Sequence, residues 1–399
     1  MRLLYQERNV LLLAGCQALF WSALMIGITM SGLVGQMLSS QKALATLPAG
    51  LLALCTILIA RPASVLMQRM GRRVGFLLGA LAGTIGGLVC AGGIFLGSFA
   101  VFCLGNAILG AYAAIGQYYR LAATDSVEPS RRGRAVSTVM AGGIVAALLA
   151  PTLSLWSKDL FAPVLFAGSF LAVTAFSLVA IGMIAAFNER APAPSEKRVQ
   201  GRPLGEIMRQ PIFLVAIANA GIANAVMILV MLATPLAMVA CSYPVSDAAT
   251  VIQWHVLGMF IPSFFTGRLV DRFGAANVGL TGAGILAVSA SVAAAGTAIA
   301  NFGIALASLG VGWNFMYVAG TAMITASHRP EERGRVQGAA ETIIAVLATL
   351  ASFASAALLH GLGWAAVNIG AAPLLIAVAA LTIWFSRRAT QIAVRARSA

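Results

Sequence analysis

Three ionisable side chains lie within long apolar stretches of the sequence: Arg61, His255 and Glu341. A charged group is costly in hydrocarbon, so residues of this kind mark candidate functional sites. His255 titrates near neutral pH and could carry a proton or donate a hydrogen bond to a solute. Glu341 could also carry a proton, or it could pair with Arg335, six residues earlier and ~9 Å away along a helix. Arg61 is close enough to the end of its stretch to reach polar surroundings, which favours a structural role.

The sequence lacks the motifs of common catalytic and metal sites. It contains no HExxH, no GxSxG, no GxxxxGK[ST] and no close pair of aspartates inside an apolar stretch. Its cysteines, Cys16, Cys55, Cys90, Cys103 and Cys241, show no metal-ligand spacing. We therefore expect neither an enzyme nor an ATP-driven pump, and neither a metal nor a cofactor.

The composition indicates which kind of element must position these groups. Of the 399 residues, 60% are hydrophobic and only 10% are charged, against ~45–50% and ~25% in soluble domains. The net charge is +14, but the basic residues lie in short gaps between apolar runs. A nucleic-acid-binding protein would gather them on one solvated face, so that class is excluded. The composition predicts an all-α integral membrane protein.

Apolar runs of about 20 residues, the length that crosses a bilayer, predict twelve transmembrane helices. They begin near Asn9, Leu44, Val74, Ser98, Ala135, Leu160, Ile212, Ala248, Asn277, Asn301, Val336 and Leu362. Residues 188–211 form the only long polar segment, which we expect to be a cytoplasmic linker. It separates an N-terminal six-helix bundle, 1–187, from a C-terminal one, 212–386, and a basic cytoplasmic tail, 387–399, follows.

The basic residues are distributed unequally between the two sides of the membrane. With twelve spans, the loops on one side contain only Lys42 and Lys158, so 24 of the 26 Lys and Arg lie on the side that both termini share. Loops rich in Lys and Arg stay in the cytoplasm. We therefore expect a multi-pass protein of the cytoplasmic (inner) membrane with both termini in the cytoplasm.

Two pairs of loops indicate an internal duplication. MQRMGRRVG at 67–75 is matched by GRLVDRFGAA at 267–276, with Gly71 and Gly274 separated by 203 residues. EPSRRGRA at 128–135 is matched by PEERGRV at 330–336, with Gly133 and Gly334 separated by 201 residues. Two independent pairs with nearly the same offset predict two six-helix repeats. Because each repeat has an even number of spans, both have the same orientation.

These loops and spans resemble the major facilitator superfamily over essentially the whole chain. The signature loop of that family runs Gly, three residues, Asp, a basic residue, one residue, Gly, then basic residues. The second copy carries Gly267, Asp271, Arg272 and Gly274, and the first keeps Arg69, Gly71, Arg72 and Arg73 but has Gln68 in place of the acid.

The resemblance implies that these loops act as conformational switches. Asp271 would contact the cytoplasmic start of a helix in the other half, where the helix dipole favours a carboxylate. The matched loops of the second pair add Arg132, Arg134, Arg333 and Arg335 to this set. The alternative is that these arginines only set the topology.

In that family the first, fourth, seventh and tenth helices line a central cavity. In this chain they carry amides and aromatic rings without a charge in their predicted interior, and the candidate substrate-binding residues are Gln17, Trp21, Asn106, Tyr112, Asn224, Trp313, Asn314 and Tyr317. Rings stack on planar solutes and amides hydrogen-bond to them, whereas phosphate esters require Arg or Lys. The resemblance thus implies a small neutral or amphipathic, aromatic, vitamin-like solute. Each residue could instead bridge or pack neighbouring helices.

The function that the resemblance implies is secondary transport by alternating access, with proton-coupled uptake or facilitated diffusion as options. Antiporters of the family often carry an Arg in the fourth helix and a Gly-Pro centre in the fifth, but here Ala150 precedes Pro151 and that Arg is missing. Efflux of a drug or metabolite stays the alternative within the family, and a receptor without turnover the alternative outside it. The expected partners are a small-molecule substrate, the lipid bilayer and, in the coupled case, protons. We expect no nucleic acid and a monomeric chain.

Overall fold

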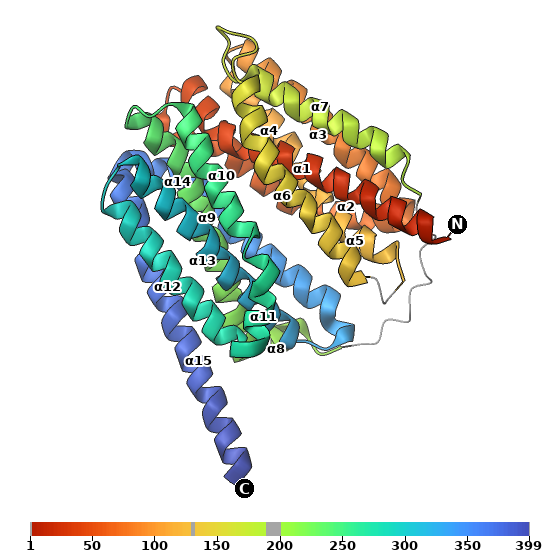
Figure 1. The fold of residues 1–399 in the computed structure, drawn as a ribbon, viewed down its shortest axis with the longest axis vertical. Coiled ribbons are helices and arrows are strands. Elements are labelled where there is room, and N and C mark those ends of the chain that lie inside the picture. Colours follow the sequence, from red (N-terminus) through yellow and green to blue (C-terminus); the bar gives the residue numbers. More distant parts are fainter. Residues whose placement is uncertain (1, 129–131, 189–200, 399) are drawn as a thin grey trace. The chain divides into compact units, whose positions relative to one another are not determined.

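A computed structural model describes residues 2–128, 132–188 and 201–398. These residues form helices joined by loops and contain no strand (Figure 1). The chain divides into two compact units. Unit 1 comprises Met1–Ser195 and Met238–Gln253, and unit 2 comprises Glu196–Ala237 and Trp254–Ala399.

The first half of the chain contains the helices α1 (Arg2–Leu38), η1 (Lys42–Leu44), α2 (Leu47–Met70), α3 (Arg72–Phe95), α4 (Phe99–Gly116), α5 (Tyr119–Asp125), α6 (Arg132–Ser157) and α7 (Ala167–Ala185). The second half contains α8 (Leu204–Met208), α9 (Pro211–Ala240), α10 (Val245–Phe260), α11 (Ser263–Phe273), α12 (Ala275–Ala294), α13 (Ile299–Ala326), η3 (Pro330–Glu332), α14 (Arg333–Ile369) and α15 (Ala372–Ser398). The ends of α9 and α10 that adjoin each other belong to unit 1.

The helices of the described residues accommodate twelve membrane spans. Ten segments are long and apolar enough to cross a bilayer, and the bent pair of α10 and α11 makes an eleventh. One of the ten, Arg333–Arg388, has 56 residues and contains α14 and the first part of α15, so it provides two spans. The all-α membrane fold that the composition predicts is therefore confirmed.

Two of the expected helix starts are wrong. The sixth span begins at Ala167 in α7 rather than near Leu160, because Leu160–Phe166 is a turn-rich loop that contains Pro163 and is apolar enough to imitate a span. The last span begins at Ala372 rather than near Leu362, because α14 continues to Ile369. No new helix starts near Leu362. The chain bends there instead, at Gly363, whose φ of 83° interrupts the regular conformation within α14.

The two signature loops adopt the same backbone conformation. Gly71 ends α2 and precedes α3 with φ 90° and ψ 158°, and Gly274 ends α11 and precedes α12 with φ 83° and ψ 148°. Residues other than glycine rarely adopt this combination of φ and ψ. A glycine is required in both loops, which agrees with a duplicated six-helix unit.

Small residues let the helices of unit 1 approach closely. On α3 a Cβ atom at Gly79 would lie 2.7 Å from Ile115 of α4, and one at Gly83 would lie 2.5 Å from Ser177 of α7. A similar crossing recurs in unit 2, where a Cβ atom at Gly310 of α13 would lie 2.3 Å from the carbonyl oxygen of His255 in α10. Lipid is as apolar as the side chains, so the hydrophobic effect does not hold helices together in a membrane. Close packing of this kind stabilises the helix pairs instead.

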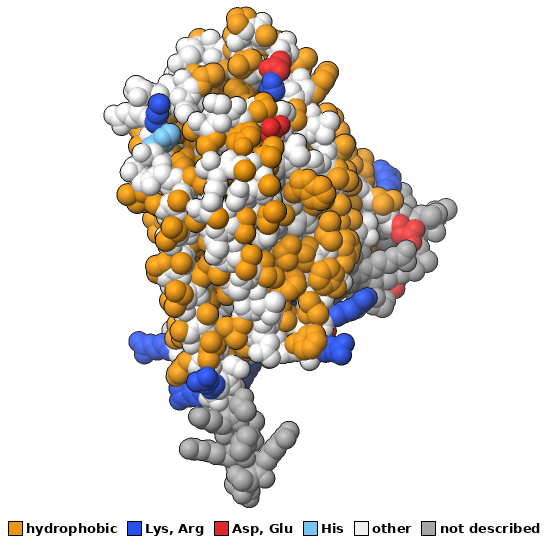
Figure 2. All heavy atoms as spheres, turned by 60° about the vertical axis from the view of Figure 1, so that its left-hand side comes forward, with side chains coloured by type: hydrophobic (Ala, Val, Ile, Leu, Met, Phe, Trp, Pro, Cys, Tyr) orange, Lys and Arg blue, Asp and Glu red, His pale blue; other side chains and the backbone are white. Residues whose placement is uncertain are grey.

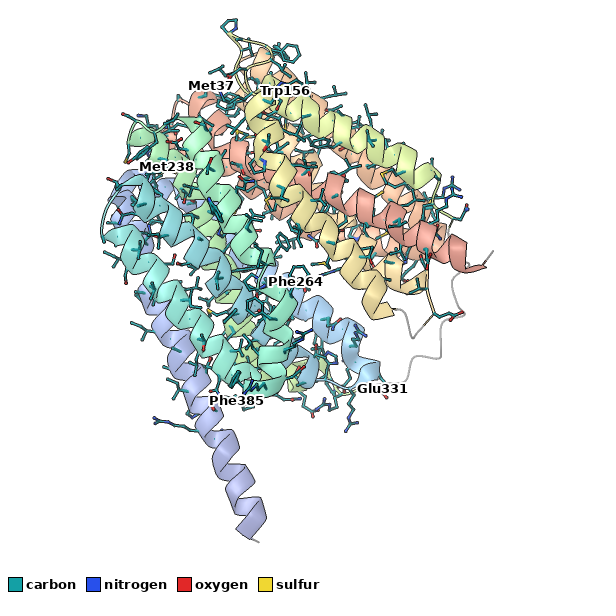
Figure 3. The ribbon with its side chains drawn as sticks, viewed as in Figure 1. Met37, Trp156, Met238, Phe264, Glu331 and Phe385 are labelled. Carbon is teal, nitrogen blue, oxygen red and sulfur yellow. The ribbon has the colours of Figure 1, made fainter. Side chains whose placement is uncertain are left out.

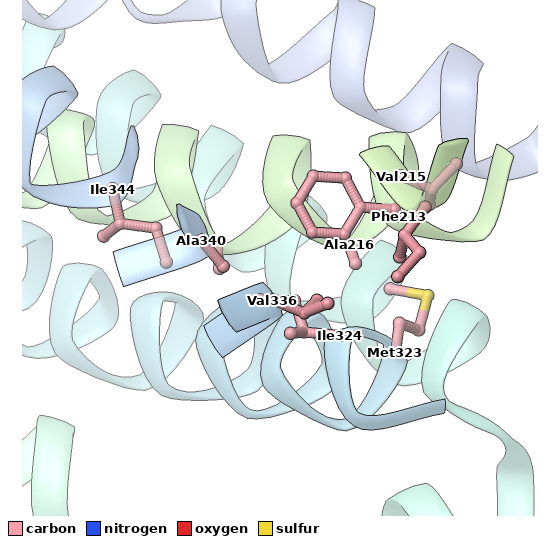
Figure 4. Close-up of a cluster of buried hydrophobic side chains, with 10 residues drawn as sticks. Phe213, Val215, Ala216, Met323, Ile324, Val336, Ala340 and Ile344 are labelled. Atoms are coloured by element: carbon pink, nitrogen blue, oxygen red, sulfur yellow. The ribbon is translucent and has the colours of Figure 1, made fainter. Parts of the chain in front are cut away.

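Unit 2 has an apolar core at one end, formed by α8, α9, α13 and α14 (Figure 4). Phe213 and Ala216 of α9 face Ile324 of α13 and Val336 of α14. Ile207 of the short α8 is fully buried in the same core. The last part of the segment between the bundles is therefore packed as part of unit 2.

Large apolar side chains also cover the outside of the helices, including Leu58, Leu104, Leu178, Ile304 and Ile376. Figure 2 shows apolar side chains over the middle of one face, with Lys and Arg mainly near one end. Within unit 1, Met37 and Trp156 mark a common end of α1 and α6 (Figure 3). Within unit 2, Glu331 and Phe385 lie toward a common end (Figure 3). This distribution is that of helices surrounded by lipid.

Candidate functional site

Two aromatic rings and an amide form a cluster inside unit 2. Trp313 and Tyr317 lie one turn apart on α13, and their rings stack with centroids 4.9 Å apart and an interplanar angle of 14°. The indole Nε1 of Trp313 donates a hydrogen bond of 3.2 Å to Oδ1 of Asn224 in α9. All three side chains are half-buried, so they are held in place but remain partly accessible.

The chemistry of this cluster suits a planar solute. Parallel rings at this spacing present an extended π face, and another flat ring adds to such a stack in an offset arrangement. Because Oδ1 of Asn224 accepts from Trp313, the amide NH₂ of Asn224 is oriented by that bond and keeps its two donor hydrogens. The cluster therefore combines stacking with hydrogen-bond donation and has no charge.

Two of the expected substrate amides already have full sets of partners. Asn314 donates to the carbonyl oxygen of Met259 (2.8 Å) and to Oγ of Ser263 (2.6 Å), and its Oδ1 accepts from Thr266 (2.7 Å). These bonds connect α13 to the bend between α10 and α11. In unit 1, Asn106 accepts from Ser31 of α1 at 2.7 Å and donates to the carbonyl oxygen of Phe102 at 3.1 Å. Both asparagines are buried bridges between helices.

The expected residues of α1 and α4 divide into two groups. Tyr112 is fully buried, and its ring packs against Gly83 of α3 and, edge on, against Phe20 at 5.3 Å between centroids. Gln17 is also buried, but its Oε1 has no hydrogen-bond partner among the described residues. Trp21, one turn later on α1, is half-buried. Tyr112 thus packs through its ring and Trp21 is partly accessible, while Gln17 and Tyr112 each keep a buried polar atom, Oε1 and Oη, without a partner among the described residues.

The two candidate proton carriers differ in exposure. His255 is completely buried, with its Nδ1 2.9 Å from the carbonyl oxygen of Leu306 in α13, and its Nε2 has no partner among the described residues. Glu341 lies on an exposed side of α14, within the candidate span Arg333–Arg388. The imidazole of His255 is therefore enclosed within unit 2, whereas the carboxylate of Glu341 is not.

The signature loop of unit 1 contains an ion pair that the sequence analysis missed. Arg72 pairs with Asp125 at the end of α5, and Arg73 donates to the carbonyl oxygen of Ala185 at the end of α7, while Arg69 is exposed. An acid from a different helix thus pairs with this loop, within the same unit. The chain has only 12 acidic residues, so each acid near a basic loop was a candidate partner.

In the second signature loop, Asp271 and Arg272 are exposed, and the guanidinium of Arg272 lies 5.2 Å from the centroid of Phe273. Gly267 is open to substitution, since a Cβ atom there would have no neighbour within 4 Å. Arg132 and Arg134 begin α6, but their side chains lie outside the described residues.

Glu332 is a second acid that the sequence analysis overlooked. Its carboxylate is buried at the start of α14 and accepts from Nε and Nη2 of Arg202 at 2.9 and 2.8 Å, and from the backbone N–H of Arg329 at 2.9 Å. The bidentate bond from Arg202, with the other donors, holds the pKa of Glu332 well below its usual range. Arg335 donates to the carbonyl oxygen of Arg202 at 2.7 Å, and Arg333 bonds to Gln337 at 3.4 Å. The segment after residue 200 is therefore bound to unit 2.

Comparison with known proteins gives consistent results. The family model of the Major Facilitator Superfamily matches residues 10–253 and 227–398. The chain is 44% identical over 366 residues to the riboflavin transporter RfnT of Brucella anthropi, covering 91% of this chain and 92% of that protein. It is also 26% identical to YddS, an uncharacterized MFS-type transporter of Bacillus subtilis, over 91% of this chain and 87% of the relative.

Solved structures share the fold at low sequence identity. An inward-facing, occupied bacterial homologue of the human lysosomal transporter Spinster superposes with a TM-score of 0.73 at 17% identity, covering 96% of this chain and 97% of that one. A structure of the nucleoside transporter NupG gives a TM-score of 0.71 at 13% identity, with 94% and 98% covered.

Proposed function

This chain belongs to the major facilitator superfamily, whose members are membrane transporters and not enzymes, and on that premise we propose that it transports a planar vitamin. Riboflavin is the first candidate solute, because the relative with 44% identity is a riboflavin transporter. A flavin ring is flat, aromatic and uncharged, which are the properties that an uncharged aromatic site selects.

The observation that carries this proposal is the stacked pair Trp313 and Tyr317 with Asn224 bonded to it. In this proposal the rings stack on the tricyclic part of the solute, and the Asn224 amide donates to a carbonyl oxygen at its edge. Gln17, whose Oε1 has no partner among the described residues, and Trp21 stay predictions from the sequence within unit 1. Asn106 and Asn314 then have stabilising roles, because their amides are hydrogen-bonded within their own units. Tyr112 contributes in the same way through its packed ring.

The transport cycle is alternating access, in which two similar bundles change their relation while a solute is bound. We assign uptake rather than export, since Ala150 occupies the place where antiporters have glycine before Pro151. If uptake is proton-coupled, Glu341 is the better carrier, because it is exposed while His255 is enclosed and bonded to Leu306. The asymmetry of Lys and Arg supports both termini in the cytoplasm, and the proposal includes a location in the inner membrane.

Uptake of labelled riboflavin into proteoliposomes tests this function. The wild type should accumulate the vitamin, and Trp313→Ala should lose most of the uptake. Trp384→Ala is the matched control, because Trp384 lies on an exposed part of α15 and should transport normally. Binding without uptake would identify a receptor, and no binding at all would remove riboflavin as the solute.

Uptake into the same proteoliposomes also tests whether transport is coupled to protons. Uptake that requires an inward proton gradient, and loses that requirement in Glu341→Gln but not in His255→Gln, supports Glu341 as the carrier. Uptake that ignores the gradient in the wild type indicates facilitated diffusion or another coupling ion, and gives both residues structural roles.

A further inference from the structure

Arg61 and Arg69 occupy one exposed face of α2. They are eight residues apart, ~12 Å along the helix axis, and Val65 lies midway on the same face. The opposite face of α2 carries Ala63 and Met67, which are buried inside unit 1. The two guanidinium groups therefore project away from the bundle to which α2 belongs.

Neither guanidinium makes a hydrogen bond or ion pair with any described residue. Other arginines of unit 1 are engaged: Arg8 donates to the carbonyl oxygen of Ala186 and Arg72 pairs with Asp125. Arg61 lies in a candidate span, Lys42–Met70, with a mean hydropathy of 2.2. A charge at such a position requires a polar or anionic partner, and a ligand can supply one.

A hollow connects the two arginines. It has a volume of about 420 Å³ and is lined by Arg61, Pro62, Val65, Leu66 and Arg69. All five lining residues come from α2, and the hollow is open on its outer side, so its volume does not limit the size of the ligand. Its two basic ends can hold the oxygens of one anionic headgroup, and its apolar side chains can contact the attached chains.

We propose that this face of α2 binds the headgroup of an anionic phospholipid. A guanidinium binds phosphate oxygens through two parallel N–H···O bonds, and the flexible arginine side chains reach along the helix toward the membrane surface. Pro62, Val65 and Leu66 then contact the acyl chains. Basic pockets beside transmembrane helices on the cytoplasmic side bind anionic lipids in this manner. This site is independent of the solute that the protein carries.

Titration of the purified, delipidated full-length protein in detergent tests the site, with bound lipid counted by native mass spectrometry. The probes are phosphatidylglycerol, phosphatidylcholine and sodium phosphate. We expect specific binding of phosphatidylglycerol, with an affinity that falls about tenfold, or ~1.4 kcal/mol, in Arg61→Gln and in Arg69→Gln. Arg61→Lys keeps the charge but not the two parallel bonds, so its affinity should be intermediate. This variant also replaces Arg61→Gln if the latter does not fold.

Arg387→Gln is the control, because it removes an exposed charge from α15 that does not line the hollow. Its affinity for phosphatidylglycerol should equal that of the wild type. An equal loss in this variant, or equal binding of both lipids by the wild type, would overturn the proposal in favour of diffuse attraction. Competition by sodium phosphate as strong as that of the lipid would overturn it in favour of a simple anion site.

Discussion

At the scale of single residues, the uncharged character of the aromatic cluster decides which solutes are compatible. Its groups offer ring faces and one amide whose orientation is set by Trp313. Such a site gives a phosphate ester no charged partner, and desolvating that anion would be costly. Under the proposed function, the same residues would favour free riboflavin over its phosphorylated forms.

The hydrogen bond between Trp313 and Asn224 can be tested apart from the ring stack. Trp313→Phe keeps an aromatic ring but removes the donor to Asn224, so the amide loses its fixed orientation. We expect riboflavin affinity to fall about fivefold, corresponding to ~1 kcal/mol for one hydrogen bond. Trp313→Ala should cost more, because the stacking surface is lost as well.

Titration of the purified protein with riboflavin measures both effects. Trp384→Phe, at an exposed position on α15, should bind as the wild type does. If Trp313→Phe bound as tightly as the wild type, the hydrogen bond to Asn224 would have no part in recognition.

At the scale of the helices, the loops between consecutive helices are fixed by a few glycines and ion pairs at the helix ends. Gly71 and Gly274 reverse the chain between two helices. Arg72 with Asp125, and Arg202 with Glu332, fasten loops to the helices of the same unit. These contacts lie where the helix ends leave backbone groups without intrahelical partners.

The positive φ of the signature glycines predicts a specific loss of stability. Gly71→Ala and Gly274→Ala should each lower the free energy of unfolding by about 1–3 kcal/mol, because alanine is strained in this backbone region. Gly182→Ala in α7 is the control, since Gly182 has no positive φ and a Cβ atom there meets nothing within 4 Å. That change should be neutral or stabilising. Thermal denaturation in detergent compares the three, and equal midpoints would contradict the predicted strain.

The pair of Arg202 and Glu332 predicts a dependence of stability on pH. The folded-state pKa of Glu332 lies below the unfolded value of ~4.3. Its contribution is therefore complete above that unfolded value and is lost as the pH falls toward the folded pKa. Glu332→Gln should lower the denaturation midpoint by a constant amount between about pH 5.5 and pH 8.

Below about pH 4, the difference between Glu332→Gln and the wild type should narrow. Glu331→Gln, at the exposed neighbouring position, should show neither effect. A difference that grows as the pH falls would refute the assignment of a depressed pKa.

At the scale of the whole molecule, the distribution of charge and the even number of spans per half predict the topology. Unit 1 and unit 2 each carry the signature loop after a pair of spans, so we expect both loops on the side that holds the termini. Cys241, in the loop between α9 and α10, is exposed, and we expect it on the other side. The remaining cysteines are buried or half-buried, which makes Cys241 a native topology probe.

A membrane-impermeant maleimide should label the wild type in intact cells, and Cys241→Ser should not be labelled. Introducing Glu331→Cys into that variant should restore labelling only after the membrane is permeabilised. The reverse pattern would place the termini outside. Labelling of both sites in intact cells would contradict the predicted number of spans between them.

Composition, apolar run length and loop repetition were enough to predict the fold class and the duplicated twelve-helix membrane architecture, because bilayer thickness imposes a length on each helix. The sequence was misleading where an apolar loop imitated a span, as at Leu160–Phe166. Side-chain partners could not be predicted in this way. The face that a helix turns toward its neighbour depends on close packing, as at Gly83 and Gly310, and the length of an apolar run does not indicate that face.

Only the tertiary structure could therefore separate similar candidates on the same helices. Asn314 and Trp313 are adjacent in sequence, yet Asn314 is buried among α10 and α11 while Trp313 stacks on Tyr317 and bonds to Asn224. Likewise, Asp125 and Glu332 became partners of arginines far from them in the sequence. The bilayer selects apolar length, which can be read along the chain. The rotation and packing of each helix select the contacts, and these emerge only when the helices meet.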